Sequence, residues 1–290
     1  MENLNKTAGI LAMAGTAFLW SIAGLFIKVI DWNPIAIAGS RSLIASAVIL
    51  LYLRHPKIHL SFAQVAAAVA NAVTMLLFVS ANKTTTATNA IVLQYFAPVS
   101  TVFISALLLK ERARWEHVVA LPVVAAGMIL MFLDELGGGR LLGNILAFLS
   151  AITFSFYFVF MRMQKDGSPL ESVLLSHWLT AAICILLSLF LPVPQVTLHS
   201  LGAIAVLGIV QIGLSAILLS IAIKRVSAVQ ANLIAVIEPV FNPVWVFLAI
   251  GEAPGTTALV GGCIILFAVT AASIISARRR EETARSDSGP

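Results

Sequence analysis

Two ionisable side chains, Arg41 and Glu238, stand within long apolar stretches of this sequence. A charge in hydrocarbon is costly, so such groups usually face the interior of a helix bundle or a water-filled cavity. Glu238 can bind a cation, take up a proton or pair with Arg41, and it precedes Asn242 by four residues, on the same helix face. Arg41 stays charged at any pH. It can contact the carboxylate of a bound molecule, but we favour a structural or gating role for it.

Proline residues interrupt the two apolar stretches that carry the most polar groups. The segment TATNAIVLQYFAPVSTVF contains Pro98, and the segment QANLIAVIEPVFNPVW contains Pro239 and Pro243. Proline lacks a backbone N–H and clashes with the carbonyl four residues earlier, so it kinks or breaks a helix. Breaks at membrane depth are tolerated where protein or cavity water covers the freed carbonyls. We assign the three prolines to structural or gating roles at a binding site; kinks that serve packing alone are the alternative.

Other polar and aromatic side chains recur at helical spacing, which places each set on one side of a helix. Asn71, Met75 and Phe78 fall at i, i+4 and i+7, and Gln211 and Ser215 fall four apart. An isolated Ser or Thr more often bonds its own helix, and an aromatic side chain more often packs or faces lipid. The candidates for contact with a bound small molecule are Trp20, Asn71, Met75, Phe78, Gln94, Tyr95, Tyr157, Gln211, Glu238 and Asn242.

The sequence carries no signature of a cofactor or a metal. Cys184 and Cys263 lie within apolar runs and have neither a disulfide framework nor metal-ligand spacing. Neither G-x-x-x-x-G-K-[ST] nor H-E-x-x-H occurs, so we expect neither ATP hydrolysis nor zinc-dependent proteolysis. His177 and Trp178 stand near the start of an apolar stretch, which places them near the membrane interface. We expect no cofactor and no enzyme activity, with proton coupling through Glu238 left open.

The composition indicates that lipid surrounds most of the chain. Of 290 residues, 60% are hydrophobic and 11% are charged, against about 45–50% and about 25% in a soluble domain. So few charges cannot cover a soluble surface. The net charge of +5 does not indicate nucleic acid, because Lys and Arg occur in small groups rather than on one face. The expected partners are a small-molecule substrate and the lipid bilayer, with no nucleic acid.

A helix needs about 20 apolar residues to cross the hydrocarbon core of a bilayer. The stretch Ser172–Ile223 is too long for one crossing and is broken at Pro192 and Pro194, so it counts as two. We therefore predict an all-α integral membrane protein with ten transmembrane helices, over Thr7–Ile27, Pro34–Leu53, Ser61–Asn82, Thr84–Leu109, Val118–Leu133, Leu141–Met161, the two parts of Ser172–Ile223, Val226–Gly251 and Ala253–Ala277.

Most of the 18 Lys and Arg residues fall on the side of the membrane that holds the N-terminus. Cytoplasmic loops carry an excess of Lys and Arg. This bias predicts that both termini are cytoplasmic, in a bacterial cytoplasmic (inner) membrane. Residues 278–290 are polar and short, and we predict a disordered cytoplasmic tail for them.

The two halves of the chain resemble each other, and we place the repeats at 7–134 and 141–277. Each half holds five predicted spans, and an odd number places the second half upside down in the membrane. Inverted repeats recur in secondary transporters, where the halves rock about a site near the membrane midplane. Matching positions include Asp31 with Asp166, Pro34 with Pro169, Lys83 with Lys224, Pro98 with Pro239 and Glu111 with Glu252.

These motifs resemble those of the drug/metabolite transporter superfamily, in its EamA-domain branch. The resemblance covers residues 8–277 and is carried by FLWS, SRSLIAS with Arg41, NAIVLQYFAPVSTVFISALLLKE, and AVIEPVFNPVWVFLAIGE. It implies two inverted bundles around a central cavity lined by predicted spans 1, 3, 4, 6, 8 and 9. One departure concerns Arg41, which has no counterpart in the second half, where Ser176 stands at the matching position.

The repeat and the resemblance predict a secondary transporter that works by alternating access. We expect it to move a small organic metabolite, an amino acid or a related compound, in the direction of export; facilitated diffusion and import are alternatives. A quaternary amine is the alternative substrate, held by Glu238 and aromatic side chains through cation–π contacts. An intramembrane enzyme and an assembly protein without transport are less favoured, since Glu238 is the only acid at membrane depth. Small-residue pairs such as Ser42 and Ser46 allow close helix approach, so both a monomer and a homodimer fit.

Overall fold

Helices make up all the regular secondary structure of the residues that the computed structural model describes, which are 2–108, 115–135, 140–163, 169–223, 225, 234–235, 237–253 and 255–287. Within these residues the predicted all-α class is confirmed. The helices are α1 (Glu2–Ser21), α2 (Ala23–Val29), α3 (Pro34–Leu53), α4 (Phe62–Thr84), α5 (Ala87–Gln94), α6 (Ala97–Leu108), α7 (Trp115–Glu135), α8 (Leu141–Met163), α9 (Pro169–Ser188), α10 (Leu198–Ala205), the π-helix η1 (Val206–Leu214), α11 (Ser215–Ile223), α13 (Ile237–Ile250) and α14 (Thr256–Asp287).

Seven segments among the described residues are long and apolar enough to cross a membrane. Two further apolar helices are shorter, namely α13 and the Leu259–Ala272 part of α14. By length and composition the chain is therefore a multi-pass membrane protein. The seven segments are Thr7–Val29, Pro34–Leu53, Phe62–Thr84, Ala87–Ser105, Leu141–Met161, Pro169–Ser188 and Leu198–Ala222.

Polar side chains cap the N-terminal ends of several of these helices. The Asn33 side chain accepts a hydrogen bond from the Ala36 N–H over 2.8 Å, and Pro34 occupies the first turn of α3. Thr86 begins α5 in the same way, because its hydroxyl accepts from the Asn89 N–H over 3.1 Å. Such caps give partners to N–H groups that the first turn of a helix leaves free. They fix where each helix starts and therefore which side chains reach the middle of the bundle.

The fourth predicted span is interrupted, as predicted. It divides into α5 and α6, and Pro98 is the second residue of α6, which begins at Ala97. Tyr95 and Phe96 form a short turn between the two helices. In the ninth span, α13 begins at Ile237, so Pro239 lies in its first turn and Pro243 lies inside it. A first turn tolerates proline because its N–H groups have no helical partner. A break before Ile237 falls outside the described residues.

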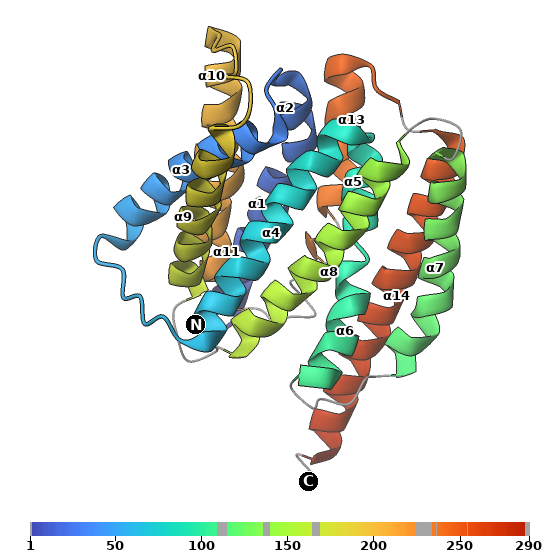
Figure 1. Cartoon of the computed structure of the whole chain (residues 1–290). Coiled ribbons are helices and arrows are strands. Elements are labelled where there is room, and N and C mark those ends of the chain that lie inside the picture. The colour runs from blue at the N-terminus through green and yellow to red at the C-terminus, as the bar shows by residue number, and fades with distance from the viewer. Residues whose placement is uncertain are drawn as a thin grey trace.

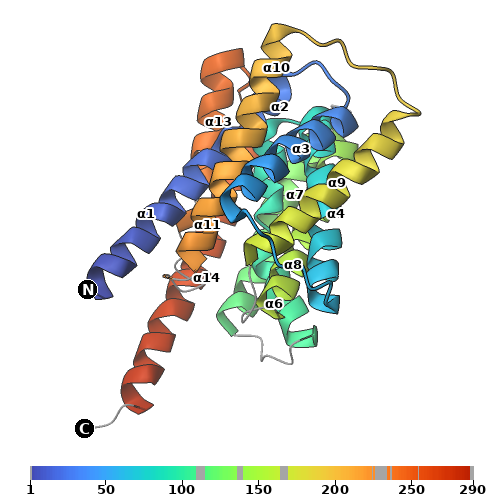
Figure 2. The same ribbon diagram turned by 90° about the vertical axis from the view of Figure 1, so that its left-hand side faces the viewer.

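Helices of the two halves pack against each other in pairs (Figures 1 and 2). In these pairs α4 runs along α8, α1 along α11, α3 along α9, and α7 along α14. In the predicted inverted repeat α4 corresponds to the span of α10, η1 and α11, and α8 corresponds to α1, so the first two pairs are related contacts. Both chain ends lie toward the end of the bundle opposite to α2 and α10 (Figure 1).

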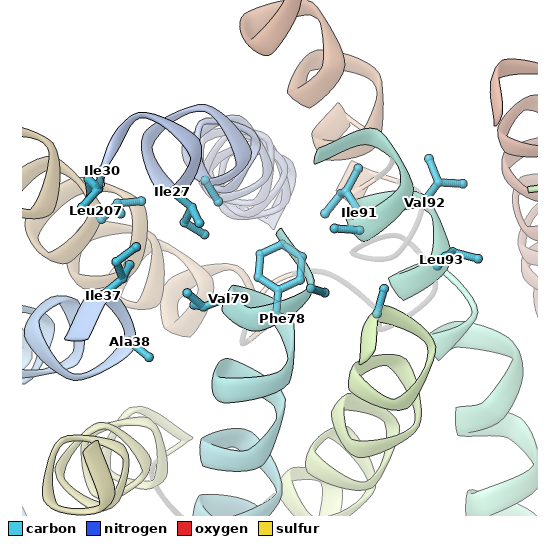
Figure 3. Close-up of a cluster of buried hydrophobic side chains, with 14 of the residues drawn as sticks. Ile27, Ile30, Ile37, Ala38, Phe78, Val79, Ile91, Val92, Leu93 and Leu207 are labelled. Atoms are coloured by element: carbon cyan, nitrogen blue, oxygen red, sulfur yellow. The ribbon is translucent and has the colours of Figure 1, made fainter. Parts of the chain in front are cut away.

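The largest apolar cluster joins both halves near α2. Figure 3 shows Phe78 of α4 between Ile27 of α2 and Ile91 of α5, and Ile37 and Leu207 belong to the same cluster. Leu207 comes from η1 in the second half, whereas the other four come from the first. Their side chains are at most 5% exposed, so dispersion and burial hold this end of the bundle together.

The C-terminal segment differs from the disordered tail predicted for 278–290, because α14 continues to Asp287. Arg and Glu are good helix formers, and the apolar part of α14 supplies the nucleus that an isolated polar segment would lack. Residues 288–290 lie outside the described residues, as do Glu111, Asp166 and Lys224, three of the positions matched by the repeat.

Candidate functional site

The predicted fourth and ninth spans meet at Tyr95 and Glu238. Tyr95 follows the last residue of α5, and its hydroxyl donates to the carbonyl of Ala235 over 2.5 Å. The same hydroxyl lies 3.4 Å from Oε2 of Glu238, in the first turn of α13. Both side chains are half-buried. The contact joins the break between α5 and α6 in the first half to the first turn of α13 in the second. It places a carboxylate near the middle of the expected span Val226–Gly251.

Arg41 lies in the interior of the bundle, near the middle of α3. Its side chain is 1% exposed. One terminal nitrogen lies 3.5 Å from Oε1 of Gln211, and the other lies 3.3 Å from Sδ of Met75. Its Nε is buried and has no hydrogen-bond partner among the described residues. Three of the predicted polar residues are therefore brought together, although none of the described contacts neutralises the charge.

A chain of contacts leads from Arg41 to Trp20. Gln211, which bonds Arg41, is followed one turn later by Ser215, whose hydroxyl donates to the Gln211 carbonyl over 2.5 Å. The indole N–H of Trp20 donates to that hydroxyl over 3.0 Å. Trp20 and Ala235, the residue whose carbonyl Tyr95 contacts, both pack on the cluster of Ala12, Met13 and Ala222. The contacts of Arg41 and those of Glu238 thus both lead to one apolar cluster.

The polar face predicted on α4 divides among different partners. Asn71 donates to the Ser176 hydroxyl over 2.7 Å, which links α4 to α9. Thr74, one turn before Phe78, donates to Thr153 of α8 over 2.8 Å. Met75 contacts Arg41, whereas Phe78 lies in the apolar cluster near α2. The spacing placed these residues on one side of the helix, but each meets a different neighbour.

His177 does not lie at the membrane interface, where the sequence placed it. Helix α9 begins at Pro169, three residues before the predicted start, so His177 sits in the middle of this span and is 2% exposed. Its Nδ1 lies 3.3 Å from the Ser42 hydroxyl of α3. The interface position was wrong because the charged Glu171 bounds the apolar stretch, whereas α9 includes Glu171, whose buried carboxylate accepts from the Lys57 N–H over 2.5 Å.

The remaining candidates lie apart from the Arg41 and Glu238 groups. Gln94 donates to Ser150 of α8 over 3.4 Å. Asn242 is fully buried, and both polar atoms of its side chain lack a hydrogen-bond partner among the described residues. Tyr157 stacks on Phe154 with ring centroids 5.9 Å apart. Tyr157 also lines an apolar pocket between α8, α9 and α11, together with Phe158, Met161, Pro169, Leu170, Val173, Ala216, Leu219 and Ser220.

Polar contacts close the end of the bundle near α2. The Lys28 ammonium lies 3.1 Å from Glu252 Oε2 and donates to the Thr85 carbonyl over 2.6 Å. The other oxygen of Glu252 accepts from the Ala87 N–H over 2.9 Å. Lys83 donates to the carbonyl of Ile30. Sequence reasoning missed this set because it matched Glu252 only with Glu111 of the other half.

A neighbouring set of amides continues this closure. The Thr85 hydroxyl donates to Oδ1 of Asn144 over 2.7 Å, and the Asn89 amide donates to the same oxygen over 3.3 Å. Asn144 belongs to α8, so both contacts join the two halves. Among the described residues no three His, Cys, Asp or Glu side chains are close enough to share a metal ion.

Comparison with known proteins matches this chain to transporters. The model of the EamA-like transporter family matches residues 7–133 and 141–274, which coincide closely with the two repeats. A protein of Archaeoglobus fulgidus described as an uncharacterized transporter is 30% identical over 207 residues, covering 70% of this chain and 73% of that protein. One crystal structure superimposes with a TM-score of 0.66 at 22% identity, over 96% of this chain and 100% of the other, and supports the fold alone.

Proposed function

Because the chain belongs to the EamA-like transporter family, we propose that it is a secondary transporter that exports an amino acid or a related small metabolite by alternating access. The observation that carries the proposal is the contact of Tyr95 with Glu238, where the break between α5 and α6 meets the first turn of α13. A helix break at membrane depth exposes backbone and side-chain groups to a transported molecule. A carboxylate at that point can receive the ammonium group of an amino acid.

The proposed bundle crosses the membrane ten times. The seven long spans, the two shorter apolar helices and α7 supply these crossings. An even number returns both termini to one side, and the distribution of Lys and Arg favours the cytoplasmic side of a bacterial inner membrane. In this orientation the end closed by Lys28 and Glu252 faces the outside.

The packing of the two halves supports alternating access. Helix α4 contacts α8, and α11, the last part of the span that corresponds to α4, contacts α1. Two such related contacts are expected to exchange when the halves rock about the central site. The Thr85 hydroxyl, just after α4, donates to Asn144 of α8 at the end proposed to face outside. Because the pair of Lys28 and Glu252 joins the halves at the same end, we assign this structure to the state that is closed to the outside.

Glu238 gives two further properties to the proposed transporter. It allows proton coupling, because a carboxylate can exchange a proton for the ammonium group of a substrate. It also supports a second substrate class, a quaternary amine, because the ring of Tyr95 lies beside the carboxylate and suits a cation through cation–π contacts. The amino acid is preferred because Arg41 places a positive charge in the same bundle interior.

The test is transport by the purified full chain in liposomes. Labelled amino acids, choline and nucleobases are loaded separately, and exchange against external unlabelled compound is measured. Binding is followed in parallel by the melting temperature, since a ligand at 100 times its Kd adds about 2.7 kcal/mol to the free energy of unfolding. Movement and stabilisation by an amino acid support the proposal. Movement of choline alone supports the quaternary amine instead.

Two variants test the role of the central contact. We expect Glu238→Gln to abolish exchange while the protein stays folded. Tyr95→Phe removes the hydroxyl that bonds Ala235 and Glu238, so it should cost about 1 kcal/mol of stability and slow exchange. Asp31→Asn and Tyr52→Phe make the same chemical changes at exposed positions and serve as controls. Unchanged exchange in both test variants would remove Glu238 and Tyr95 from the site.

A further inference from the structure

The positive charge of Arg41 lacks a negative partner among the described residues. Its two contacts are with neutral groups, the amide oxygen of Gln211 and the sulfur of Met75. The ion pair of Lys28 with Glu252 lies elsewhere, at the end of the bundle. Arg41 is the seventh residue after Pro34, the first residue of α3. At 1.5 Å per residue this places it about 10 Å along a helix of about 30 Å.

A guanidinium without a counter-charge in the interior of the bundle lowers the stability of the fold. Arginine does not lose its proton in proteins, and a buried charge without a counter-charge is strongly destabilising. A guanidinium also has five N–H donors. Here one donor contact is as long as 3.5 Å, one goes to sulfur, and Nε has none. The group therefore has both charge and donor capacity left for an anion, and a carboxylate can take two of these donors at once.

The helices around Arg41 pack closely against one another. Gln211 lies in the π-helix η1, a form that is rare and often found at functional sites. Gly208 of η1 lies so near α3 that a side-chain carbon there would be 2.5 Å from Cβ of Ile44 and 3.1 Å from the Arg41 carbonyl oxygen. The close packing of η1 on α3 therefore places Gln211 beside Arg41. Met75 and Gln211, which cover the guanidinium, are unbranched side chains that can swing aside.

We propose that Arg41 and Gln211 form the binding point for the carboxylate group of the transported molecule. Gln211 is linked through Ser215 to Trp20. The assignment rests on the proposed function and sharpens it, because it selects substrates that carry a carboxylate. The same chemistry suits an inorganic anion such as chloride, and the experiment separates the two sources.

The first experiment uses the full chain without any mutation. The melting temperature is measured in a buffer whose only anion is a bulky sulfonate, and then with chloride, with acetate, and with amino acids beside their amides. The proposal expects a saturable rise with acetate and with amino acids, and none with the amides, which lack the carboxylate. A rise with chloride alone, or no rise with any anion, would overturn it.

Variants then assign the effect to Arg41. Arg41→Lys keeps a positive charge but loses the fork geometry, and we expect roughly 30-fold weaker binding of the amino acid. Arg54→Lys makes the same change at the exposed end of α3 and should leave binding unchanged. If Arg41 only braces the fold, the lysine variant lowers the melting temperature in every buffer and leaves the ligand-induced shift intact.

Gln211→Glu gives a second test that does not depend on losing Arg41. It places a built-in carboxylate beside the guanidinium, so the melting temperature without ligand should rise and the shifts with acetate and amino acid should disappear. Persistence of both shifts in this variant would contradict the site. The outcomes for the proposed function are distinct from these. Carboxylate-dependent binding without exchange in liposomes would support the site and contradict transport. Exchange of amino acid amides at the rate of the acids would contradict the site and support transport.

Discussion

The ammonium of Lys28 lies 3.1 Å from the carboxylate of Glu252, and this ion pair joins the two halves of the chain. Lys28 belongs to the last turn of α2, and Glu252 follows α13. Both side chains have second partners in the segment between α4 and α5, the Thr85 carbonyl and the Ala87 N–H. The end of α2, the start of α5 and the end of α13 are therefore held together, beside the apolar cluster of Ile27 and Phe78.

Neutralising either member of this pair should loosen the closed end. For Lys28→Gln and Glu252→Gln we expect a loss of roughly 1 kcal/mol from the pair itself, because both side chains are partly exposed and water screens them. Chemical unfolding of the two single variants and the double variant measures this coupling. The charge swap Lys28→Glu with Glu252→Lys should recover part of it; strictly additive losses would show that the two charges act independently.

Substitution of Gly24 should separate the helices that meet near Asn242. A side-chain carbon at Gly24 would lie 2.5 Å from the Asn242 oxygen and 2.9 Å from Cβ of Ala87. Overpacking of this kind costs about 1–3 kcal/mol. Gly24→Ala should therefore lower the free energy of unfolding, as measured by denaturant titration of the purified protein.

Substitution of Asn242 should restore part of the stability that Gly24→Ala removes. Its side chain is buried and without a hydrogen-bond partner among the described residues, so Asn242→Ala removes the obstacle without breaking a described bond. The double variant should be more stable than Gly24→Ala alone. Gly202→Ala is the control, because nothing lies within 4 Å of the added carbon, and better helix propensity should stabilise α10 by up to about 1 kcal/mol. A Gly24→Ala variant as stable as this control would contradict the packing.

The proposed orientation can be tested by labelling. Asp31 and His55 are both exposed and lie just before and just after α3. In a chain with Cys184→Ala and Cys263→Ala, intact cells should expose Asp31→Cys to an impermeant maleimide. His55→Cys should react only after the membrane is permeabilised, because the excess of Lys and Arg places its loop in the cytoplasm. The reverse pattern would invert the topology and with it the assignment of the closed end.

Helix positions and breaks could be predicted because they depend on residues that are close in the sequence. The apolar stretch Pro34–Leu53 has the same bounds in the structure as in the prediction. Pro98 predicted the division between α5 and α6 for a local steric reason. The family also followed from motifs, since the matched regions 7–133 and 141–274 coincide with the predicted repeats. The helical end of α14 was missed because its apolar part carries the helix on into polar residues. The start of α9 was missed because the charged Glu171, which the helix includes, bounds the apolar stretch.

Local patterns were enough to predict a helical, repeated chain that lies in lipid and has a break beside Pro98. The contacts of Arg41 with Gln211 and of Lys28 with Glu252 became known from the packing of the helices. The difference lies in the distance over which each effect acts along the chain. Hydropathy and proline sterics act over one or two turns, whereas the partner of a side chain depends on how each helix is rotated and packed against segments more than a hundred residues away.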